Sequence, residues 1–411
     1  MDMLLRQNAE KIARKAIDAV KPDEAVRRAL EHIHLAGRVY LVAVGKAAWQ
    51  MAHAAVSYLK EPIHQGIVVT KYGHVMGEIP GVACYEAGHP VPDENSIQAT
   101  QAVLDMTDHL REEDTVLFLL SGGGSALFEK PLVDESVLQE VTKKLLSGGA
   151  DITQINTIRK RLSAVKAGRF AQHCEPAQVE AIILSDILGD PVDMIASGPA
   201  AADPVTKEEA KAVAADYGLN KLDGVQACLE LETPKEVSNV HTQIIGSVRQ
   251  LCQAAEKEAV SMGYECVFLT DHLDGEASDT GRWLAGEMKK YVGQGRKVAL
   301  LAGGETVVHL KGNGLGGRNQ ELALSAAQEL ADIPGAALIS VGSDGTDGPT
   351  DAAGGYADGD TVRQLEERGL DIQDYLENND SYHALKAIGN LIITGPTGTN
   401  VNDLTIGLIH G

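Results

Sequence analysis

Hydrophobic and polar positions follow two different rhythms along the chain. Short apolar, β-branched runs recur at intervals, and most are followed by segments such as 131–146 and 318–330, in which apolar residues lie three and four positions apart. The short runs predict strands, and the spaced segments predict helices. The predicted strands are Val39–Val44, Gly66–Val69, Val82–Tyr85, Val116–Leu120, Glu180–Leu184, Gln243–Ile245, Glu265–Leu269, Val298–Ala302, Val307–Leu310, Ala337–Val341 and Leu391–Ile393.

The predicted strands are apolar along most of their length, which is typical of strands buried on both faces of a mainly parallel sheet. Strands that alternate with helices in this way predict an α/β fold, doubly wound, with helices on both sides of the sheet. A chain of 411 residues is too long for one ordinary core. We therefore predict two α/β domains, 1–237 and 238–411, because the weakest pattern lies in 202–239.

Composition and charge exclude several classes of protein. The hydrophobic fraction of 44% and the mean hydropathy of -0.10 are typical of a soluble globular chain. No apolar stretch is long enough to cross a bilayer, and the first twenty or so residues resemble an amphipathic helix rather than a signal peptide. We expect a cytoplasmic protein with no membrane partner. The net charge of -22 argues against nucleic acid as a partner, and the five cysteines lack metal-binding spacing.

The segment VLFLLSGGGSAL, Val116–Leu127, is an apolar run that stops at small residues and then continues as a predicted helix. A strand that ends in glycines leaves backbone N–H groups unpaired, and the start of the next helix adds partial positive charge. We predict a phosphate-binding loop here, with a plain tight turn as the alternative. No Lys-Ser/Thr pair closes the loop, so it is not a Walker A motif. The predicted contacts are Ser121, Gly122, Gly123, Gly124 and Ser125.

Lys46 follows the strand Val39–Val44 in a Gly-Lys turn that leads into a helix. A cation is electrostatically disfavoured at a helix start, so its placement needs an explanation. Lys46 can contact a transferring phosphoryl group, and the alternative is a solvated lysine. Asp186 and Asp190 follow another strand and are flanked by glycine. Such a pair can bind magnesium or take a proton from a hydroxyl, although aspartates also cap helices. We predict Asp186 as a catalytic residue and Asp190 as a metal ligand.

Positive charge is concentrated in Asn156–Arg169, NTIRKRLSAVKAGR. Helical spacing puts Arg159, Ser163 and Lys166 near one face, where the two cations can bind a carboxylate or phosphate. The alternative is a solvated basic face. Because the rest of the chain is so acidic, we predict that Arg159 and Lys166 bind an anionic substrate.

The motif GNGLGG, Gly312–Gly317, fits the dinucleotide fingerprint, since it follows a predicted strand and opens a predicted helix. It motivates the alternative function of an NAD(P)-dependent hydroxypyruvate reductase. Arg318 and Asn319, at the start of that helix, can instead address an anionic group directly. A later acidic cluster, Asp344, Asp347 and Asp351, can bind metal or cap a turn, and we predict Asp344 as a metal ligand.

Eight segments in this order resemble the class II glycerate kinases, which combine a glycerate-kinase N-terminal domain with a C-terminal MOFRL domain. The segments are VAVGKAA, GHPVPDENS, LSGGGSALFEKP, NTIRKRLSAVKAGR, LSDILGDPVDMIASGPAAADPVT, AGGETVVHLKGNGLGGRNQE, VGSDGTDGPTDAAGG and TGPTGTNVNDL. The chain departs from the family at Leu315 and Gly316, where a Lys-Gly pair is frequent. This departure leaves Arg318 in place.

The resemblance implies two Rossmann-like domains with an active site in the cleft between them. It implies transfer of the ATP γ-phosphoryl group to D-glycerate with magnesium, and 2-phosphoglycerate as the usual product. The residues that match Lys46 and Arg318 are those most often implicated in the family. The expected partners are therefore small molecules, D-glycerate and ATP, with a homodimer as a possible assembly. A nucleotide-binding regulator without catalysis is a third hypothesis.

Overall fold

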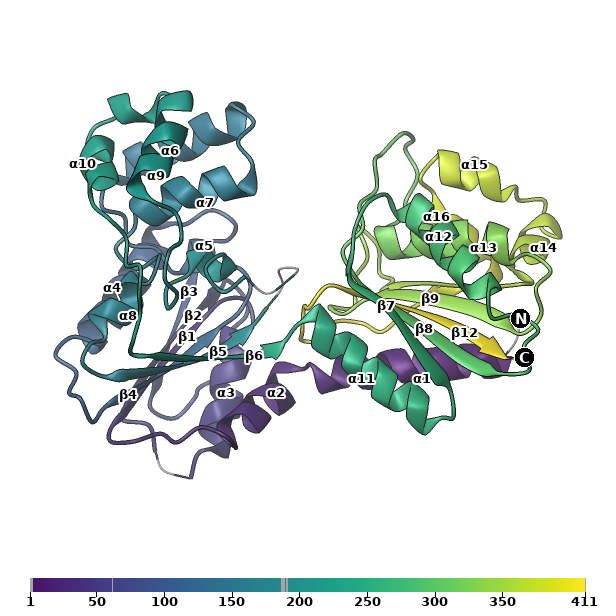
Figure 1. Ribbon diagram of the computed structural model, residues 1–411, viewed down its shortest axis with the longest axis horizontal. Coiled ribbons are helices and arrows are strands. Elements are labelled where there is room, and N and C mark those ends of the chain that lie inside the picture. The colour runs from purple at the N-terminus through teal and green to yellow at the C-terminus, as the bar shows by residue number, and fades with distance from the viewer. Residues whose placement is uncertain (1–2, 61, 186–188, 190, 411) are drawn as a thin grey trace. The chain divides into compact units, whose positions relative to one another are not determined.

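The computed structural model describes residues 3–60, 62–185, 189 and 191–410 (Figure 1). Contacts divide the chain into two compact units. The first unit groups 22–60 and 62–185 with 191–245, and the second groups 3–21 and 189 with 246–410. Asp186 and Asp190 lie outside the described residues, so the structure bears on neither prediction. Within the described residues, no helix is long and apolar enough to span a bilayer.

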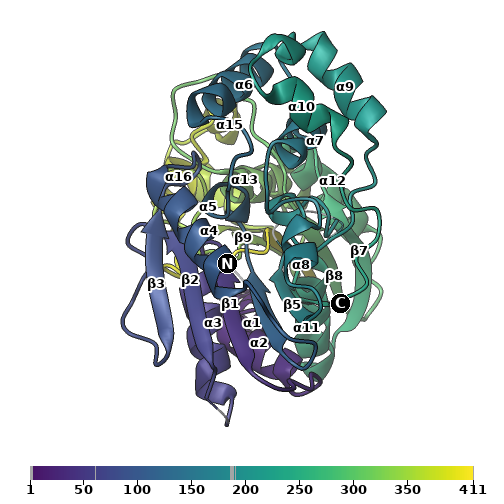
Figure 2. The ribbon, with the colours of Figure 1, turned by 90° about the vertical axis from the view of Figure 1, so that its left-hand side faces the viewer.

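The first unit contains a sheet of six strands in the order β3-β2-β1-β4-β5-β6. Figure 2 shows β1, β2 and β3 side by side. The pairings β2-β3, β1-β2, β1-β4 and β4-β5 are all parallel, as predicted. The strands are β1 (Val39–Val44), β2 (Gln65–Lys71), β3 (Val82–Ala87), β4 (Thr115–Leu120), β5 (Gln178–Leu184) and β6 (Val240–Gly246).

Helices of the first unit cover this sheet and build a smaller core beside it. Phe118 of β4 packs against Phe128 and Phe170 in the main core. A second cluster, which includes Val141, Leu145 and Ile158, is formed mainly by α6, α7, α9 and α10. The helices are α2 (Pro22–Leu30), α3 (Ala48–Tyr58), α4 (Glu94–Met106), α5 (Gly124–Leu127), α6 (Glu135–Ser147), α7 (Ile152–Arg161), α8 (Arg169–His173), α9 (Lys207–Asp216) and α10 (Val225–Glu230), with 3-10 turns at Ile195–Ser197 and Leu219–Lys221.

The second unit contains a sheet in the order β11-β10-β9-β12-β8-β7. Only β7 and β8 pair in parallel, whereas the pairings β8-β12, β12-β9, β9-β10 and β10-β11 are antiparallel. The α/β class is confirmed, but the expectation of a mainly parallel sheet is wrong for this unit. The strands are β7 (Glu265–Leu273), β8 (Lys297–Gly304), β9 (Ala336–Gly342), β10 (Gly354–Asp358), β11 (Leu391–Ile392) and β12 (Asp403–His410).

Helices cover both faces of the second sheet. Figure 1 shows α1 and α11 on one face and α12, α13 and α16 on the other. The helices are α1 (Met3–Ala19), α11 (Val248–Ser261), α12 (Ala277–Lys289), α13 (Arg318–Leu330), α14 (Thr361–Glu366), α15 (Ile372–Glu377) and α16 (Ser381–Ile388).

The grouping of α1 differs from the predicted division at residue 237. The amphipathic pattern of α1 buries an apolar face that includes Leu5, Ile12 and Ile17. This face packs on α11 and on strands β9 and β12 of the second unit. The first residues of the chain therefore complete the core of the unit that also contains its last residues.

Candidate active site

In the first unit, the loop that follows β1 and the loop that follows β4 are joined by backbone hydrogen bonds. The Ser121 amide donates to the Val44 carbonyl at 2.9 Å, and the Lys46 amide donates to the Gly122 carbonyl at 2.8 Å. Gly45 makes this approach feasible, because a Cβ at that position would lie 2.2 Å from Ser121 Oγ. The structure thus brings Lys46 and the glycine-rich loop together at the carboxyl ends of adjacent parallel strands, where ligands bind in α/β folds.

Four consecutive backbone N–H groups of this loop have no acceptor within the described residues. They belong to Gly122, Gly123, Gly124 and Ser125, whereas the amides on either side, those of Ser121 and Ala126, are hydrogen-bonded. Gly123 has φ 89° and ψ -6°, the left-handed conformation that turns successive amides toward one side. Unpaired amides in a row need an acceptor other than the described residues, such as water or the oxygens of a ligand. We call residues 122–125 the amide cradle.

The helix predicted after the loop is present but short. α5 spans only Gly124–Leu127, which is a single turn. The macrodipole of one turn is small, so a helix N-terminus adds little attraction for an anion here. The attraction has to come from the individual amides of the cradle and from nearby cations.

Lys46 and His89 border the cradle. A Cβ built at Gly123 would lie 3.2 Å from Lys46 Cγ and 3.1 Å from the His89 ring. Burial and then the charge of Lys46 lower the pKa of His89 below its ordinary 6.5, so the ring is uncharged at pH 7. His89 was not among the predicted site residues. The signal was its position in GHPVPDENS, a loop that comes directly after β3.

The two predicted substrate-binding cations, Arg159 and Lys166, both donate to the Ser125 carbonyl of the amide cradle. Lys166 is fully buried, and its ammonium donates to the carbonyls of Ser125 and Phe128 at 3.0 and 2.8 Å. It also pairs with Glu129 at 3.0 Å. Burial lowers the pKa of Lys166 despite this carboxylate. All three donor positions are therefore committed within the chain, which does not favour the predicted substrate contact.

The guanidinium of Arg159 makes fewer contacts within the described chain than the ammonium of Lys166 does. Its Nη2 donates to the Ser125 carbonyl at 3.2 Å, and the side chain is half-buried. Its neighbours Lys160 and Arg161 are buried and pair with Asp203. The alternative of a solvated basic face therefore does not hold for Lys160 and Arg161, which are buried.

The second unit holds the other predicted cation. Arg318, the first residue of α13, donates from Nε and Nη2 to the two carboxylate oxygens of Asp403 at 2.6 and 3.0 Å. Its Nη1 lies 2.9 Å from a Glu305 oxygen, and the side chain remains 34% exposed. This planar, two-point pairing fixes the guanidinium and leaves part of it open to a ligand. Asp403 comes from TGPTGTNVNDL, but the sequence offered no reason to pair it with Arg318.

Burial and the ion pair oppose each other in this cluster. Burial raises the pKa of Asp403 from 3.8 to about 6, although Arg318 works to lower it. Burial alone would lower the pKa of Arg318, but the hydrogen bond and charge of Asp403 outweigh burial and raise it. Arg318 is therefore permanently charged, and the protonation of Asp403 sets how far that charge is neutralised.

The buried position of Asn319 does not favour the prediction that its side chain binds an anionic ligand. It is 2% exposed; its side-chain oxygen accepts from Ser340 at 2.6 Å, and its amide nitrogen donates to Asp347 at 3.3 Å. Asp347 also accepts from the backbone amides of Asn319 and Gln320 at 3.1 and 2.9 Å. Asp347 thus caps α13, and Asn319 supports the helix start from which Arg318 projects.

The three aspartates of the acidic cluster, Asp344, Asp347 and Asp351, have different hydrogen-bond partners. Asp344 is half-buried and accepts from the Thr346 amide at 2.9 Å, while Asp351 accepts from the Tyr382 hydroxyl at 2.8 Å. Among the described residues, no group of three or more metal-ligating side chains is found. Asp344 therefore remains a predicted metal ligand that needs oxygen donors from another source.

The GNGLGG motif is packed against the loop 378–381. The amides of residues 312 to 315 donate, in order, to Asn379 Oδ1, Asn378 Oδ1, the Asn378 carbonyl and Asp380 Oδ1, at 3.1, 3.1, 2.9 and 2.9 Å. The predicted strand Val307–Leu310 before it forms only an isolated bridge at Val307. A dinucleotide needs both the strand and free amides. The structure thus removes the feature that motivated NAD(P) binding.

Comparison with known proteins covers nearly the whole chain. Residues 8–230 match a domain of unknown function, DUF4147, and residues 298–403 match the MOFRL family. A D-glycerate 2-kinase of Thermotoga maritima is 54% identical over 411 residues, which cover 98% of this chain and 98% of that protein. The chain belongs to the class II glycerate kinase family.

A solved structure extends this likeness to the fold. The crystal structure of a glycerate kinase from Thermotoga maritima matches with a TM-score of 0.95 at 54% identity, covering 98% of this chain and 99% of that one. The family also includes a relative with a different name, a putative hydroxypyruvate reductase of Agrobacterium vitis, 38% identical over 422 residues, covering 99% of this chain and 95% of that protein. Lys46 and Arg318 each fall within one of the two matched regions.

Proposed function

We propose that this protein transfers the γ-phosphoryl group of ATP to D-glycerate, giving 2-phosphoglycerate and ADP. The observation that carries the proposal is the amide cradle, in which four consecutive N–H groups that have no acceptor among the described residues lie beside Lys46. Its geometry suits the oxygens of a polyphosphate. The Thermotoga maritima relative of 54% identity supports glycerate as the acceptor.

Charge neutralisation is the main task in this chemistry, because charge spreads over the transferring oxygens. We assign this task to Lys46 and Arg318. The Lys46 side chain is exposed, and no partner for its ammonium is found in the described part of the chain. Arg159 is the candidate for the glycerate carboxylate. Lys166 positions the loop instead, since it holds the Ser125 and Phe128 carbonyls.

Magnesium is the proposed metal. It usually binds through one or two carboxylates together with substrate phosphates and water, so it does not need a protein cage. Asp344 is the described residue that fits this role, and the proposal includes Asp190 from outside the described residues. Bound magnesium supplies positive charge to the phosphate oxygens. Activity is expected to disappear on titration with EDTA and to return with added Mg²⁺. Turnover that persists in EDTA would contradict the metal assignment.

Phosphorus NMR of a mixture of enzyme, ATP, Mg²⁺ and D-glycerate tests the whole proposal. The expected result is loss of the ATP γ signal with appearance of ADP and 2-phosphoglycerate. A 3-phosphoglycerate signal would keep the kinase and correct its regiochemistry. Oxidation of NADH by hydroxypyruvate, with no ATP-dependent product, would replace the proposal by the reductase. ATP binding without turnover would leave a regulator.

A further inference from the structure

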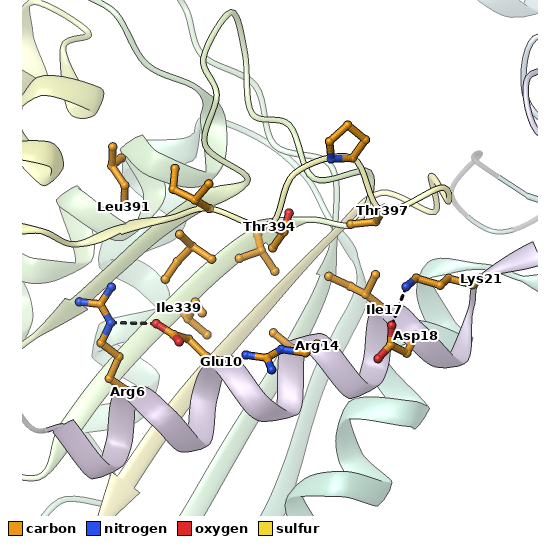
Figure 3. A pocket seen from close by; sticks show the side chains of 15 residues that line it. Arg6, Glu10, Arg14, Ile17, Asp18, Lys21, Ile339, Leu391, Thr394 and Thr397 are labelled. Atoms are coloured by element: carbon orange, nitrogen blue, oxygen red, sulfur yellow. Dashed lines mark hydrogen bonds and ion pairs between the residues drawn. The ribbon is translucent and has the colours of Figure 1, made fainter. Parts of the chain in front are cut away.

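A cavity of about 600 Å³ lies within the second unit, apart from the residues discussed so far (Figure 3). One wall is helix α1, and the other is formed by β9, β11 and the segment 393–397 that follows β11. Its volume is in the range of small-molecule sites. Neither Arg318 nor the amide cradle lines it.

Both ends of this cavity are fixed by contacts between its walls. At one end, Arg6 of α1 donates to the Gly389 carbonyl at 2.9 Å, and its guanidinium lies 5.3 Å from the Tyr356 ring centre. At the other end, Thr399 Oγ1 donates to the Val20 carbonyl at 3.0 Å. The helix is thus held to the opposite wall on either side of the cavity, so the space between them is part of the fold.

The floor of the cavity is apolar. Ile339 and Val341 of β9 and Ile17 of α1 are almost completely buried, and they line the cavity together with Ile392. Ile393 stands at the mouth and is 59% exposed. Leu391 and Pro396 of the same wall are also accessible. An occupant with an apolar body would cover Leu391, Ile393 and Pro396, and burial of apolar surface is the source of affinity in most small-molecule sites.

The wall formed by α1 and Lys21, which follows this helix, carries more positive than negative charge. Charged side chains at positions 6, 10, 14 and 18 of α1 line the cavity, at the spacing of one helix face. Arg6 pairs with Glu10 at 2.8 Å, and Lys21 pairs with Asp18 at 2.7 Å. Arg14 lies between these two pairs (Figure 3), and in the described part of the chain no hydrogen bond or ion pair is found for it. Arg14 is exposed, so its guanidinium is accessible to a ligand in the cavity.

We propose that this cavity binds a small organic anion, whose apolar body lies against Leu391, Ile393 and Pro396 and whose carboxylate or sulfonate pairs with Arg14. These apolar side chains distinguish this ligand class from the polyphosphate expected at the amide cradle. The wall segment of this cavity is also tied to the region near Arg318. The Thr397 amide donates to the Asp344 carbonyl at 3.1 Å, and the Val401 amide donates to Ser343 Oγ at 2.8 Å.

The proposed test uses anilinonaphthalene sulfonate, an anionic probe with an apolar body that fluoresces when it leaves water. Its affinity is measured by titration of the full-length wild-type chain and of two variants of α1. Arg14→Gln removes the unpaired cation and is expected to weaken binding about tenfold, as for one charge-assisted contact. Lys15→Gln removes an exposed cation that does not line the cavity, so it should change affinity less than about twofold.

Hydrogen exchange locates the probe independently of affinity. Bound probe is expected to protect the amides of segment 389–399. Ile393→Ser, an exposed substitution that removes apolar contact, should weaken binding severalfold. Equal affinities for the Arg14→Gln and Lys15→Gln variants would overturn the proposal. So would protection confined to residues outside α1, β9 and 389–399, which would show that the probe binds elsewhere.

Discussion

Two glycine-rich segments, one in each unit, use their backbones in opposite ways. In the first unit, the amides of residues 122–125 have no acceptor within the described chain. In the second unit, the amides of residues 312–315 all donate to the loop 378–380. Both segments resemble phosphate-binding loops in sequence. The difference shows that glycine content allows close approach, while the partner of each amide decides whether a ligand or the protein itself occupies the space.

The glycines of the two segments serve different neighbours. At Gly312 and Gly314, an added Cβ would lie 2.4 Å from Asn378 and Asp380 atoms, so these residues let two loops pack together. At Gly123, the nearest atoms belong to the Lys46 and His89 side chains at 3.1 to 3.2 Å. The first arrangement stabilises the fold, and the second keeps the surface near a cation open.

The largest effect is expected for Lys46→Ala. Loss of the cation beside the amide cradle should lower kcat with ATP and D-glycerate at least about a hundredfold, because charge on the transferring group is no longer neutralised. Circular dichroism should show an unchanged fold. Lys60→Ala, an exposed lysine after α3, serves as the control and should retain full activity. Near-normal turnover in the Lys46→Ala enzyme would remove this lysine from the site.

Gly123→Ala and Gly314→Ala compare the two segments directly. Alanine at Gly123 must adopt φ 89° and place a methyl group in the cradle, so the KM for ATP should rise about thirtyfold. Alanine at Gly314 should lower the free energy of unfolding by about 1–3 kcal/mol, because it meets Asp380, and should change the KM for ATP less than about twofold. Steady-state kinetics and urea unfolding measure both. The reverse pattern would reassign nucleotide binding to the second segment.

Arg318→Lys should lower kcat about tenfold. Lysine retains the charge but loses the planar fork that pairs with both Asp403 oxygens. Arg363→Lys, at an exposed ion pair on α14, is the matched control and should leave kcat unchanged. If the Arg318→Lys enzyme kept full kcat, the arginine would have a structural role only.

A smaller effect is expected in the pH dependence of stability. Because burial raises the pKa of Asp403 to about 6, the folded chain holds this proton more tightly than the unfolded chain does. Its contribution to the free energy of unfolding is therefore fully present below about pH 4. That contribution falls by roughly 1 kcal/mol per pH unit as the pH rises toward 6.

Asp403→Asn removes this titration, so urea unfolding at several pH values should show a shallower fall between pH 4 and 6 than in wild type. Other buried carboxyls, such as Asp347 and Glu321, also have a raised pKa. The comparison is therefore made between the two chains and not within one. Equal slopes in both chains would mean that Asp403 does not titrate in this range.

Much of the first unit was predictable because its strands and the loops at their ends are specified by short, continuous stretches of sequence. An apolar run that ends in SGGGS specifies both a buried strand and a loop with free amides, and GK after another such run places Lys46 at the same sheet edge. The roles of Lys166 and Asn319 were not predictable, since a basic or amide side chain in a sequence does not reveal that it is buried and already bonded. His89 and Asp403 were not predicted as site residues, because the residues they lie beside, Gly123 and Arg318, are distant from them in sequence.

The strand directions of the second sheet could not be predicted from the periodicity of apolar residues. Its strands β10 and β12 contain glycine and polar residues, as in GGYAD and DLTIGLIH, so neither has the continuous apolar run typical of a buried strand. Val307–Leu310 does have an apolar pattern but lies in a loop. Pattern alone therefore predicted the α/β class but not the strand directions of this sheet.

The position of α1 has a consequence for folding. This helix packs on β12, so its apolar face, including Leu5 and Ile12, is buried only when two segments that are very far apart in the sequence meet. Closing so long a loop costs conformational entropy before the contact forms, so we expect the core of the second unit to be completed later in folding than that of the first. Until then, the apolar face of α1 is exposed to aggregation.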